Sequence, residues 1–444
     1  MLRWSLPKIP TAPFCPSEVQ GSVQIPSTGS SWRKLLAFLG PGLLVSVGYM
    51  DPGNWATDIE GGARFGYSLL SVIFLSNLIA ILLQALCVRL GIVAEQDLAQ
   101  SCQRHFSRPI NLMLWLFAEI AIIATDLAEI LGSALALNLL FHLPLAWGVC
   151  ITGFDLVVVL LLQGKGFRWL EAIILGLVAT IALCFSIEIL FSQPNWSDVF
   201  QGYVPTLDIV QQREKLYLAI SILGATVMPH NLYLHSAIVQ TRAYDKSLIS
   251  QQEVIRYATL DSTVSLIGAL FVNSAILIVS AATFHFSGNQ QVAEIQDAYR
   301  LLAPLLGTGA ASLLFGLALL ASGQSSTFTG TIAGQVIMEG FLDWRIPCWL
   351  RRVITRTLAI VPALIGLALL GEQGVGRLLV LSQVILSLQL PFAIFPLILF
   401  TSNPHVMGKF ANPGWLKVLV WAIGLVIAGL NIWLLGQFLV GDGN

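Results

Sequence analysis

The sequence predicts an all-α integral membrane protein, and three observations carry that prediction. Of the 444 residues, 56% are hydrophobic, only 11% are charged, and the mean hydropathy is +0.79. A soluble protein carries about 25% charged residues, so these charges could not cover the surfaces of three soluble domains of about 150 residues each. From residue 36 onward, apolar segments follow one another with short polar breaks. Such a chain is expected to lie within a lipid bilayer.

Eleven apolar segments are each about as long as the ~20 residues that cross a bilayer as a helix. The predicted spans cover about residues 36–62, 67–93, 112–141, 146–163, 168–192, 216–241, 259–285, 309–338, 352–371, 376–400 and 415–440. Before them, residues 1–34 are polar, with prolines at a spacing of three from Pro7 to Pro16. That spacing suits a polyproline II ligand, but we expect a disordered cytoplasmic tail.

The charge balance and the cysteines exclude several functions. Lys and Arg total 23 against 24 Asp and Glu, so there is no basic field of the kind that nucleic-acid binding requires. The six cysteines lie far apart without a CxxC pair, which argues against a disulfide framework or a thiolate metal site. No obligate protein partner is implied, and membrane lipid is expected to surround the chain.

Lys and Arg are distributed unevenly among the loops. With the N-terminus in the cytoplasm, eighteen of the 23 basic residues fall on the cytoplasmic side. The other five are Arg64, Arg213, Lys215, Arg300 and Arg377. Because basic loops stay cytoplasmic, this bias supports both the orientation and the number of spans. We expect a multi-pass protein of the bacterial cytoplasmic membrane with its C-terminus outside.

The first and the sixth predicted spans contain the same interruption. Residues 48–54 read Gly-Tyr-Met-Asp-Pro-Gly-Asn, and residues 224–231 read Gly-Ala-Thr-Val-Met-Pro-His-Asn. Proline removes a backbone donor and clashes with the preceding turn, so each span is expected to break into two half-helices. Non-helical backbone at membrane depth survives only where it is buried in protein or lines a cavity.

Two broken helices at matching positions of two five-helix halves are typical of inverted-repeat transporters, which bind their substrate at the membrane midplane. A pair of ordinary proline kinks is the alternative. Kinks would not need Asp51, whose charge costs about 2.5–3.5 kcal/mol at the centre of a membrane helix. We therefore interpret the breaks as a binding site.

The residues at the breaks indicate a cation. Asp51 offers a carboxylate, Asn54 a carbonyl oxygen and Met228 a thioether, while unwound backbone near Gly48 and Ala225 frees carbonyl groups. Oxygen ligands around one carboxylate suit a hard divalent cation, whereas a thioether favours softer transition metals. Mn²⁺ and Fe²⁺, with Cd²⁺ as an unphysiological guest, fit better than Mg²⁺. A gap-filling role in the core is the alternative for Met228.

These two motifs resemble the paired signatures of the Nramp family of proton-coupled divalent metal transporters, the bacterial branch in particular. Residues 121–129, 323–327, 382–384 and 389–392 also resemble that family. The similarity covers about residues 36–400. It implies a LeuT-like ten-helix inverted-repeat core over residues 35–400, with repeat one at about 35–192 and repeat two at about 215–400, and then a loop and an eleventh helix over 401–444.

The resemblance also implies a ligand set and a mechanism. The metal is held at the positions of Asp51, Asn54 and Met228, with a backbone carbonyl of Gly48 or Ala225 as the site alternates. Gln383 matches a glutamine that approaches the metal in some states. The family often has alanine at the position of Gly48, a departure that keeps the carbonyl. A secondary active transporter is expected rather than an enzyme, with Mn²⁺, Fe²⁺ and H⁺ as transported substrates and no resident cofactor.

The third span carries a second set of ionisable residues. Glu119, Asp126 and Glu129 fall within about 80° of arc on one helix face. Three carboxylates there would repel one another unless they were protonated or paired. This arrangement predicts a proton relay.

Candidate partners of these carboxylates are His230, His235, Arg352 and Arg356. Histidine exchanges protons near neutral pH. In the Nramp family, the positions of Asp51, the three carboxylates, His235 and the two arginines are implicated in proton movement. Anchoring of the membrane segment is the alternative for the arginines, and polar packing is the alternative for His230.

Four other acidic residues, Asp155, Glu188, Asp261 and Glu339, lie near span ends or toward loops and are expected to be solvated or to snorkel. Two other function classes stay open. An organic-solute or amino-acid symporter could share the fold, although Asp51 argues against an anionic substrate. A membrane metalloenzyme would want a His and Glu cluster such as HExxH, which does not occur.

Overall fold

The structure, a computed structural model, describes residues 19–25, 31–153, 167–244, 249–292, 294–306, 309–344, 348–371 and 374–441. The part of the predicted fourth span beyond Gly153 lies outside these residues, as do residues 1–18 and 26–30 of the predicted tail.

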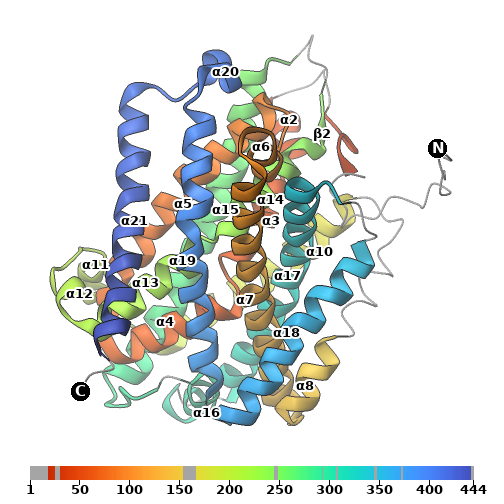
Figure 1. The fold of residues 1–444 in the computed structure, drawn as a ribbon. Coiled ribbons are helices and arrows are strands. Elements are labelled where there is room, and N and C mark those ends of the chain that lie inside the picture. Colours follow the sequence, from red (N-terminus) through yellow and green to blue (C-terminus); the bar gives the residue numbers. More distant parts are fainter. Residues whose placement is uncertain are drawn as a thin grey trace.

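Long helices lie side by side in one bundle (Figure 1). They are α5 (Leu70–Val93), α7 (Arg108–Phe141), α10 (Phe167–Ser192), α15 (Gln251–Ser280), α17 (Gly309–Leu342), α18 (Cys348–Leu370), α19 (Val375–Thr401) and α21 (Gly414–Gly441). Shorter helices connect them: α6 (Leu98–His105), α8 (Leu145–Thr152), α11 (Trp196–Gly202), α12 (Asp208–Gln211), α16 (Ile295–Leu306) and α20 (Pro404–Met407). Single turns lie at Gly66–Leu69, Val239–Thr241, Ala281–His285 and Gly408–Phe410. We call the top of Figure 1 the α6 end and the bottom the α16 end.

Eight helical stretches of the described residues are long and apolar enough to cross a membrane. They are Pro52–Val93, Arg108–Phe141, Phe167–Ser192, Gln251–His285, Gly309–Leu342, Leu350–Leu370, Val375–Thr401 and Gly414–Gly436. In α10, α18 and α21, only 33%, 28% and 28% of the most apolar 18-residue stretch is buried inside the protein. Such exposed apolar faces suit contact with lipid. The chain is therefore a multi-pass membrane protein with an all-α bundle.

The first and sixth predicted spans are each divided into shorter helices. α3 (Pro41–Gly48) precedes α4 (Pro52–Phe65), and α13 (Arg213–Thr226) precedes α14 (Pro229–Ile238). α4 and α14 both begin with proline, at a position where a missing N–H costs nothing. Eight candidate spans therefore stand where eleven were predicted. α4 and α5 count together as one stretch, Pro52–Val93, the sixth span is divided into α13 and α14, and the fourth span is described only as α8.

Part of the predicted tail packs against the bundle. β1 (Val23–Gln24) pairs in parallel with β2 (Arg242–Ala243), which follows α14. The apolar side chains of this segment, those of Val19, Val23 and Ile25, are buried. α2 (Ser31–Phe38) then leads into α3. The expectation of a disordered tail is thus corrected for residues 19–25 and 31–34, because alternating apolar residues and strand pairing hold the first of these segments in place.

Small residues let α7 and α17 approach closely at the centre of the bundle. A Cβ atom added to Gly323 would lie 2.3 Å from Ser133 Oγ, and one added to Gly132 would lie 2.1 Å from Pro52 Cβ. Close approach at small residues is how membrane helices pack. As a result, α7 lies directly against the start of α4.

Candidate metal site

Asp51 is the last residue of the first interruption and directly precedes α4. It is the N-cap of that helix, and its Oδ1 accepts a hydrogen bond from the N–H of Asn54 at 2.8 Å. A carboxylate here also complements the positive end of the helix dipole. Asp51 and Asn54 are both buried, and Asp51 Oδ2 and Asn54 Oδ1 have no hydrogen-bond partner among the described residues.

The prolines of the two interruptions free one carbonyl group each. In an α-helix the carbonyl of residue i accepts the N–H of residue i+4, and Pro52 and Pro229 have no N–H. The carbonyls four residues earlier, of Gly48 and Ala225, therefore lack their helical donors. The two backbone groups named as candidate ligands are the ones that the prolines release.

Neighbouring helices hold the non-helical segment of the first interruption. Asn273 Nδ2 of α15 donates to the carbonyl of Tyr49 at 2.8 Å, and Ser322 Oγ of α17 donates to the carbonyl of Met50 at 2.5 Å. Trp55 Nε1 also donates to Met50, at 3.3 Å. These bonds satisfy the backbone that the helix leaves unpaired.

The two interruptions and α19 meet one another. A Cβ atom added to Gly48 would lie 2.3 Å from Asn231 Nδ2, so the end of α3 touches the start of α14. Gln383 of α19 contacts both α4 and α13. A Cβ atom on Gly53 would lie 1.7 Å from the side-chain Nε2 of Gln383, and one on Gly224 would lie 2.3 Å from its backbone carbonyl oxygen. The structure thus brings Gln383 beside both breaks. Its Oε1 is buried and has no partner among the described residues.

Met228 completes the set of donors at the breaks. It is the N-cap of α14 and is fully buried, in a small apolar cluster with side chains of α7 and α19. Within the described part of the chain, no three His, Cys, Asp or Glu side chains converge on one point. A metal at the breaks would therefore meet one carboxylate, amide and backbone oxygens, and a thioether. This mixed set can serve Mn²⁺ or Fe²⁺.

The three carboxylates of α7 each face an arginine of α18. The ion pairs are Arg351–Glu119 at 2.8 Å, Arg352–Asp126 at 3.0 Å and Arg356–Glu129 at 3.7 Å. Arg356 also lies 3.8 Å from Asp126. All six side chains are buried or nearly so. Because each charge has an opposite charge beside it, these six side chains can lie inside the bundle.

The two histidines of α14 lie in different surroundings. His230 Nδ1 is 3.3 Å from Thr125 Oγ1 of α7, so this ring adjoins the helix of the carboxylates. His235 Nδ1 lies 2.9 Å from Gln84 Oε1, and Gln84 Nε2 donates to the Tyr49 hydroxyl at 2.7 Å. His235 is thus linked to α5 and to the first interruption.

Sequence reasoning missed several of these residues. Arg351, the partner of Glu119, was counted only as a basic loop residue. Three carboxylates on one face of a membrane helix call for protons or cations, but their spacing does not show which arginine lies beside Glu119. No sequence signal pointed to Thr125, Gln84 or Tyr49, since a single polar residue in an apolar span shows neither its partner nor its role.

The expectation that four further acids are solvated needs correction. Asp261 is buried and accepts the N–H of Gly42 at 2.7 Å at the start of α3. Glu188 is also buried, and its two carboxylate oxygens have no partner among the described residues. Both residues are buried by the packing of the protein around them, and the position of a residue near a span end does not reveal such packing. Glu339 is partly exposed, and Asp155 lies outside the described residues.

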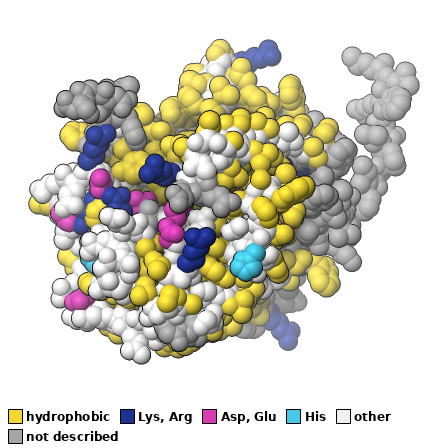
Figure 2. Space-filling view, turned by 90° about the horizontal axis from the view of Figure 1, so that it is seen from below, with side chains coloured by type: hydrophobic (Ala, Val, Ile, Leu, Met, Phe, Trp, Pro, Cys, Tyr) yellow, Lys and Arg dark blue, Asp and Glu magenta, His cyan; other side chains and the backbone are white. Residues whose placement is uncertain are grey.

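The surface at the α16 end carries both signs of charge (Figure 2). Arg64 pairs with Glu60 at 2.6 Å and with Glu214, and Lys215 pairs with Asp208. The hydrogen bond from Lys215 lowers the pKa of the carboxyl of Asp208, the first residue of the short helix α12. The surface at this end is therefore mixed in charge.

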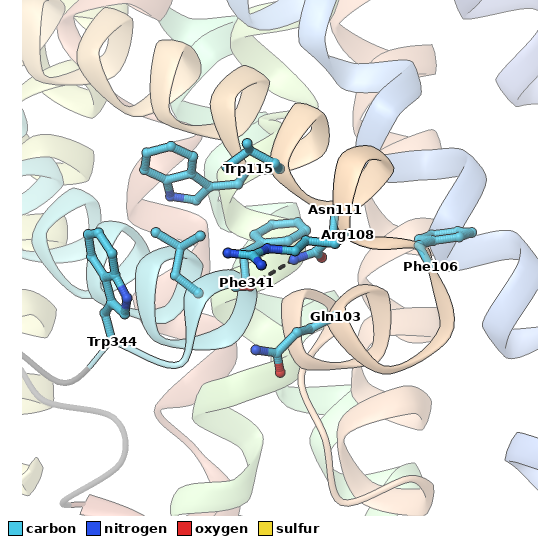
Figure 3. Close-up of a pocket in the computed structure, with 9 residues that line it drawn as sticks. Gln103, Phe106, Arg108, Asn111, Trp115, Phe341 and Trp344 are labelled. Carbon is cyan, nitrogen blue, oxygen red and sulfur yellow. Dashed lines mark hydrogen bonds between the residues drawn. The ribbon is translucent and has the colours of Figure 1, made fainter.

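A separate pocket of about 430 Å³ lies at the α6 end, between α6, α7 and α17 (Figure 3). Arg108, Trp115 and Trp344 line it, and Asn111 Nδ2 donates to the carbonyl of Phe341 at 2.8 Å. Neither a carboxylate nor a sulfur atom is among its lining groups. Its chemistry does not suit a cation, unlike that of the breaks.

Fold and site together define a class: a helical membrane protein of the transporter type, with two interrupted helices meeting at a buried polar centre. The sequence model described as natural resistance-associated macrophage protein-like, Nramp, matches residues 42–437. The chain belongs to the Nramp family.

Similar proteins agree with this assignment. A divalent metal cation transporter MntH of Nostoc sp. is 63% identical over 96% of both chains, and one of Ralstonia nicotianae is 56% identical over 98% of this chain and 99% of that protein. The structure of an Eremococcus coleocola manganese transporter, in complex with an aromatic bis-isothiourea compound, is 41% identical, with a TM-score of 0.87 over 96% of this chain and 92% of that one. MhsT in complex with L-phenylalanine is 14% identical, with a TM-score of 0.58 over 89% and 97%, and shares the fold alone.

Proposed function

We propose that this chain imports divalent transition-metal ions, Mn²⁺ and Fe²⁺ with Cd²⁺ as an unphysiological substrate, together with protons. The observation that carries the proposal is the set of buried oxygens on Asp51, Asn54 and Gln383, which have no hydrogen-bond partner in the described part of the chain and lie where the two interrupted helices meet. Buried polar groups without partners are costly, and a bound cation would satisfy them. The names of the relatives, divalent metal cation transporters and a manganese transporter, support this substrate class.

In this proposal the metal is bound by the two breaks and α19. Its ligands are Asp51, Asn54, Met228, the carbonyl of Gly48 or Ala225, and in some states Gln383. The oxygens suit Mn²⁺ and Fe²⁺, and the thioether disfavours Mg²⁺ and Ca²⁺ relative to softer ions. Asp51 must be ionised to bind metal, so metal and proton compete for it.

Protons move along the second buried set. The proposed pathway comprises Asp51, Glu119, Asp126, Glu129, His230, His235, Arg352 and Arg356. The contact of Gly132 with Pro52 supports a link between the two sets, because Glu129 lies one turn from Gly132 on α7. A carboxylate held beside an arginine can exchange that partner for a proton without leaving the bundle.

Transport proceeds by alternating access as secondary active transport. Eleven spans form a ten-helix, five-plus-five inverted repeat and one further helix, with the N-terminus in the cytoplasm and the C-terminus outside. The excess of Lys and Arg in alternate loops supports this orientation. The α6 end is then cytoplasmic and the α16 end faces outward.

Proteoliposomes containing the purified protein test this function. We expect Mn²⁺ added outside to enter and the lumen to acidify at the same time, while excess Mg²⁺ leaves Mn²⁺ entry unchanged. Empty vesicles are the control. An amino-acid symporter of the same fold would take up solute without Mn²⁺ flux, and that result would refute the proposal, as would metal binding without any flux.

A further inference from the structure

We propose that Asp58 forms a second cation position, outward of Asp51, which receives the metal ion before it reaches the interrupted helices. The inference rests on the proposed function and adds a site to it. Asp58 belongs to α4 and is 1% exposed. Its Oδ2 has no hydrogen-bond partner among the described residues, and no basic side chain of the described residues forms an ion pair with it.

Asp58 lies on the same face of α4 as the proposed ligands. Asp51, Asn54 and Asp58 are separated by three and four residues, which places them within about 60° of arc around the helix. At 1.5 Å per residue, Asp58 lies about 6 Å further along the axis than Asn54 and about 10 Å further than Asp51. Asp58 is therefore too far away to share an ion with Asp51, and close enough to hold the ion one step earlier.

Neighbouring glycines show which helices this face meets. A Cβ atom on Gly62 would lie 2.6 Å from the carbonyl oxygen of Leu277 of α15, and one on Gly61 would lie 3.8 Å from Ile222 Cδ1 of α13. Asp58 is one turn before these two glycines on the same side of α4. Its side chain thus faces the region between α13 and α15.

Those two helices carry further unpaired polar atoms. Thr226 Oγ1, at the end of α13, and Asn273 Oδ1, on α15, are buried without hydrogen-bond partners among the described residues. Hydroxyl and amide oxygens are ligands that hard divalent cations accept. Asn273 also donates through its Nδ2 to the carbonyl of Tyr49 at 2.8 Å. A carboxylate that faces two helices carrying such oxygens has the chemistry of a transient cation site.

Glu60 is the other acidic residue within α4, and it is neutralised by a basic side chain of the protein. It lies two residues from Asp58, on another face, and pairs with Arg64 at 2.6 Å. The helix thus carries one acid with a protein partner and one that has none among the described residues. This difference makes Glu60 a matched control for Asp58.

The first test is Mn²⁺ uptake into proteoliposomes as a function of external Mn²⁺. In Asp58→Asn and Asp58→Ser we expect KM to rise about threefold or more with the maximal rate within about twofold, because only capture of the ion is weakened. Glu60→Gln should behave as the unchanged protein. If the unchanged protein takes up no metal, the proposed function itself fails; if it does and KM is the same in both Asp58 variants, only this inference fails.

The second test is equilibrium binding of Mn²⁺ to detergent-purified protein. Asp51→Ala should keep weak binding that the double variants Asp51→Ala with Asp58→Asn or with Asp58→Ser lose. Equal binding by the single and double variants would overturn the proposal and leave Asp58 as a protonated structural residue. Elution volume and unfolding temperature must match those of the unchanged protein for each variant that is compared.

Discussion

Two sets of polar side chains lie deep in this bundle, one at the interrupted helices and one between α7 and α18, and they differ in how they are satisfied. At the interrupted helices, oxygens of Asp51, Asn54 and Gln383 have no hydrogen-bond partner among the described residues. Along α7 and α18, by contrast, Glu119 and Asp126 lie 2.8 and 3.0 Å from arginines.

The difference separates a site that is completed by a ligand from one that is completed by the protein. An unpaired buried carboxylate is costly, so its persistence indicates a function, whereas a paired carboxylate can be explained by the packing alone. Glu129 is intermediate. The guanidinium of Arg356 lies 3.7 Å from it, and its oxygens make no hydrogen bond among the described residues.

The largest effect is expected from Asp51→Ala. It removes the only carboxylate that the proposed ligand set contains, so Mn²⁺ uptake into proteoliposomes should fall to the level of empty vesicles. Asp198→Ala, in the exposed helix α11, is the control and should transport normally. Retained transport by Asp51→Ala would contradict the assignment of the metal site.

A second variant tests the paired region. Arg352→Met leaves the buried Asp126 without its partner at 3.0 Å, and breaking such a pair costs about 3–5 kcal/mol. The unfolding temperature in detergent should drop strongly. Adding Asp126→Leu should restore most of it, because a buried pair can be replaced by apolar residues. If the double variant is as unstable as Arg352→Met, then pairing is not what keeps Asp126 inside the bundle.

A smaller effect is expected from Met228→Ala at the breaks. Loss of the thioether should leave Mn²⁺ uptake measurable and let Ca²⁺ or Mg²⁺ compete better with it, because only oxygen ligands remain. Competition assays with a tenfold excess of each ion measure this. An unchanged selectivity profile would reduce Met228 to a packing residue of its apolar cluster.

The smallest effect concerns a carboxylate whose partners are backbone groups. Asp97 caps α6, outside the spans, and burial raises its pKa to about 7. The folded protein therefore holds this proton more tightly than the unfolded chain, so stability should fall as pH rises from about 4 to 7. Asp97→Asn keeps the capping acceptor and should remove that pH dependence from unfolding temperatures recorded across the range. The same slope in the variant would rule out Asp97 as its source.

Much of this arrangement could be predicted from local sequence. Pro52 and Pro229 each begin a new half-helix, as the missing N–H predicts, although Pro391 and Pro396 lie inside the continuous helix α19. Glu119, Asp126 and Glu129 share a face by spacing alone. What pairs with what could not be predicted, because it depends on which helices pack together. Arg351 beside Glu119 is the example: spacing within α18 does not show that α7 is its neighbour.

The same limit explains Asp58 and the tail. Asp58 shares its face with Asp51 by spacing, yet its burial without a partner depends on α13 and α15. The pairing of β1 with β2 joins segments about 220 residues apart along the chain, and two-residue strands leave no periodic signal.

The most direct test of the account is a crystal structure of the protein with Mn²⁺, with the ion located by its anomalous scattering. The account predicts a strong peak between Asp51, Asn54 and the sulfur of Met228, with a released carbonyl of Gly48 or Ala225 in contact with it. A Mn²⁺ peak among the carboxylates of α7, with the interrupted helices left without metal, would contradict it.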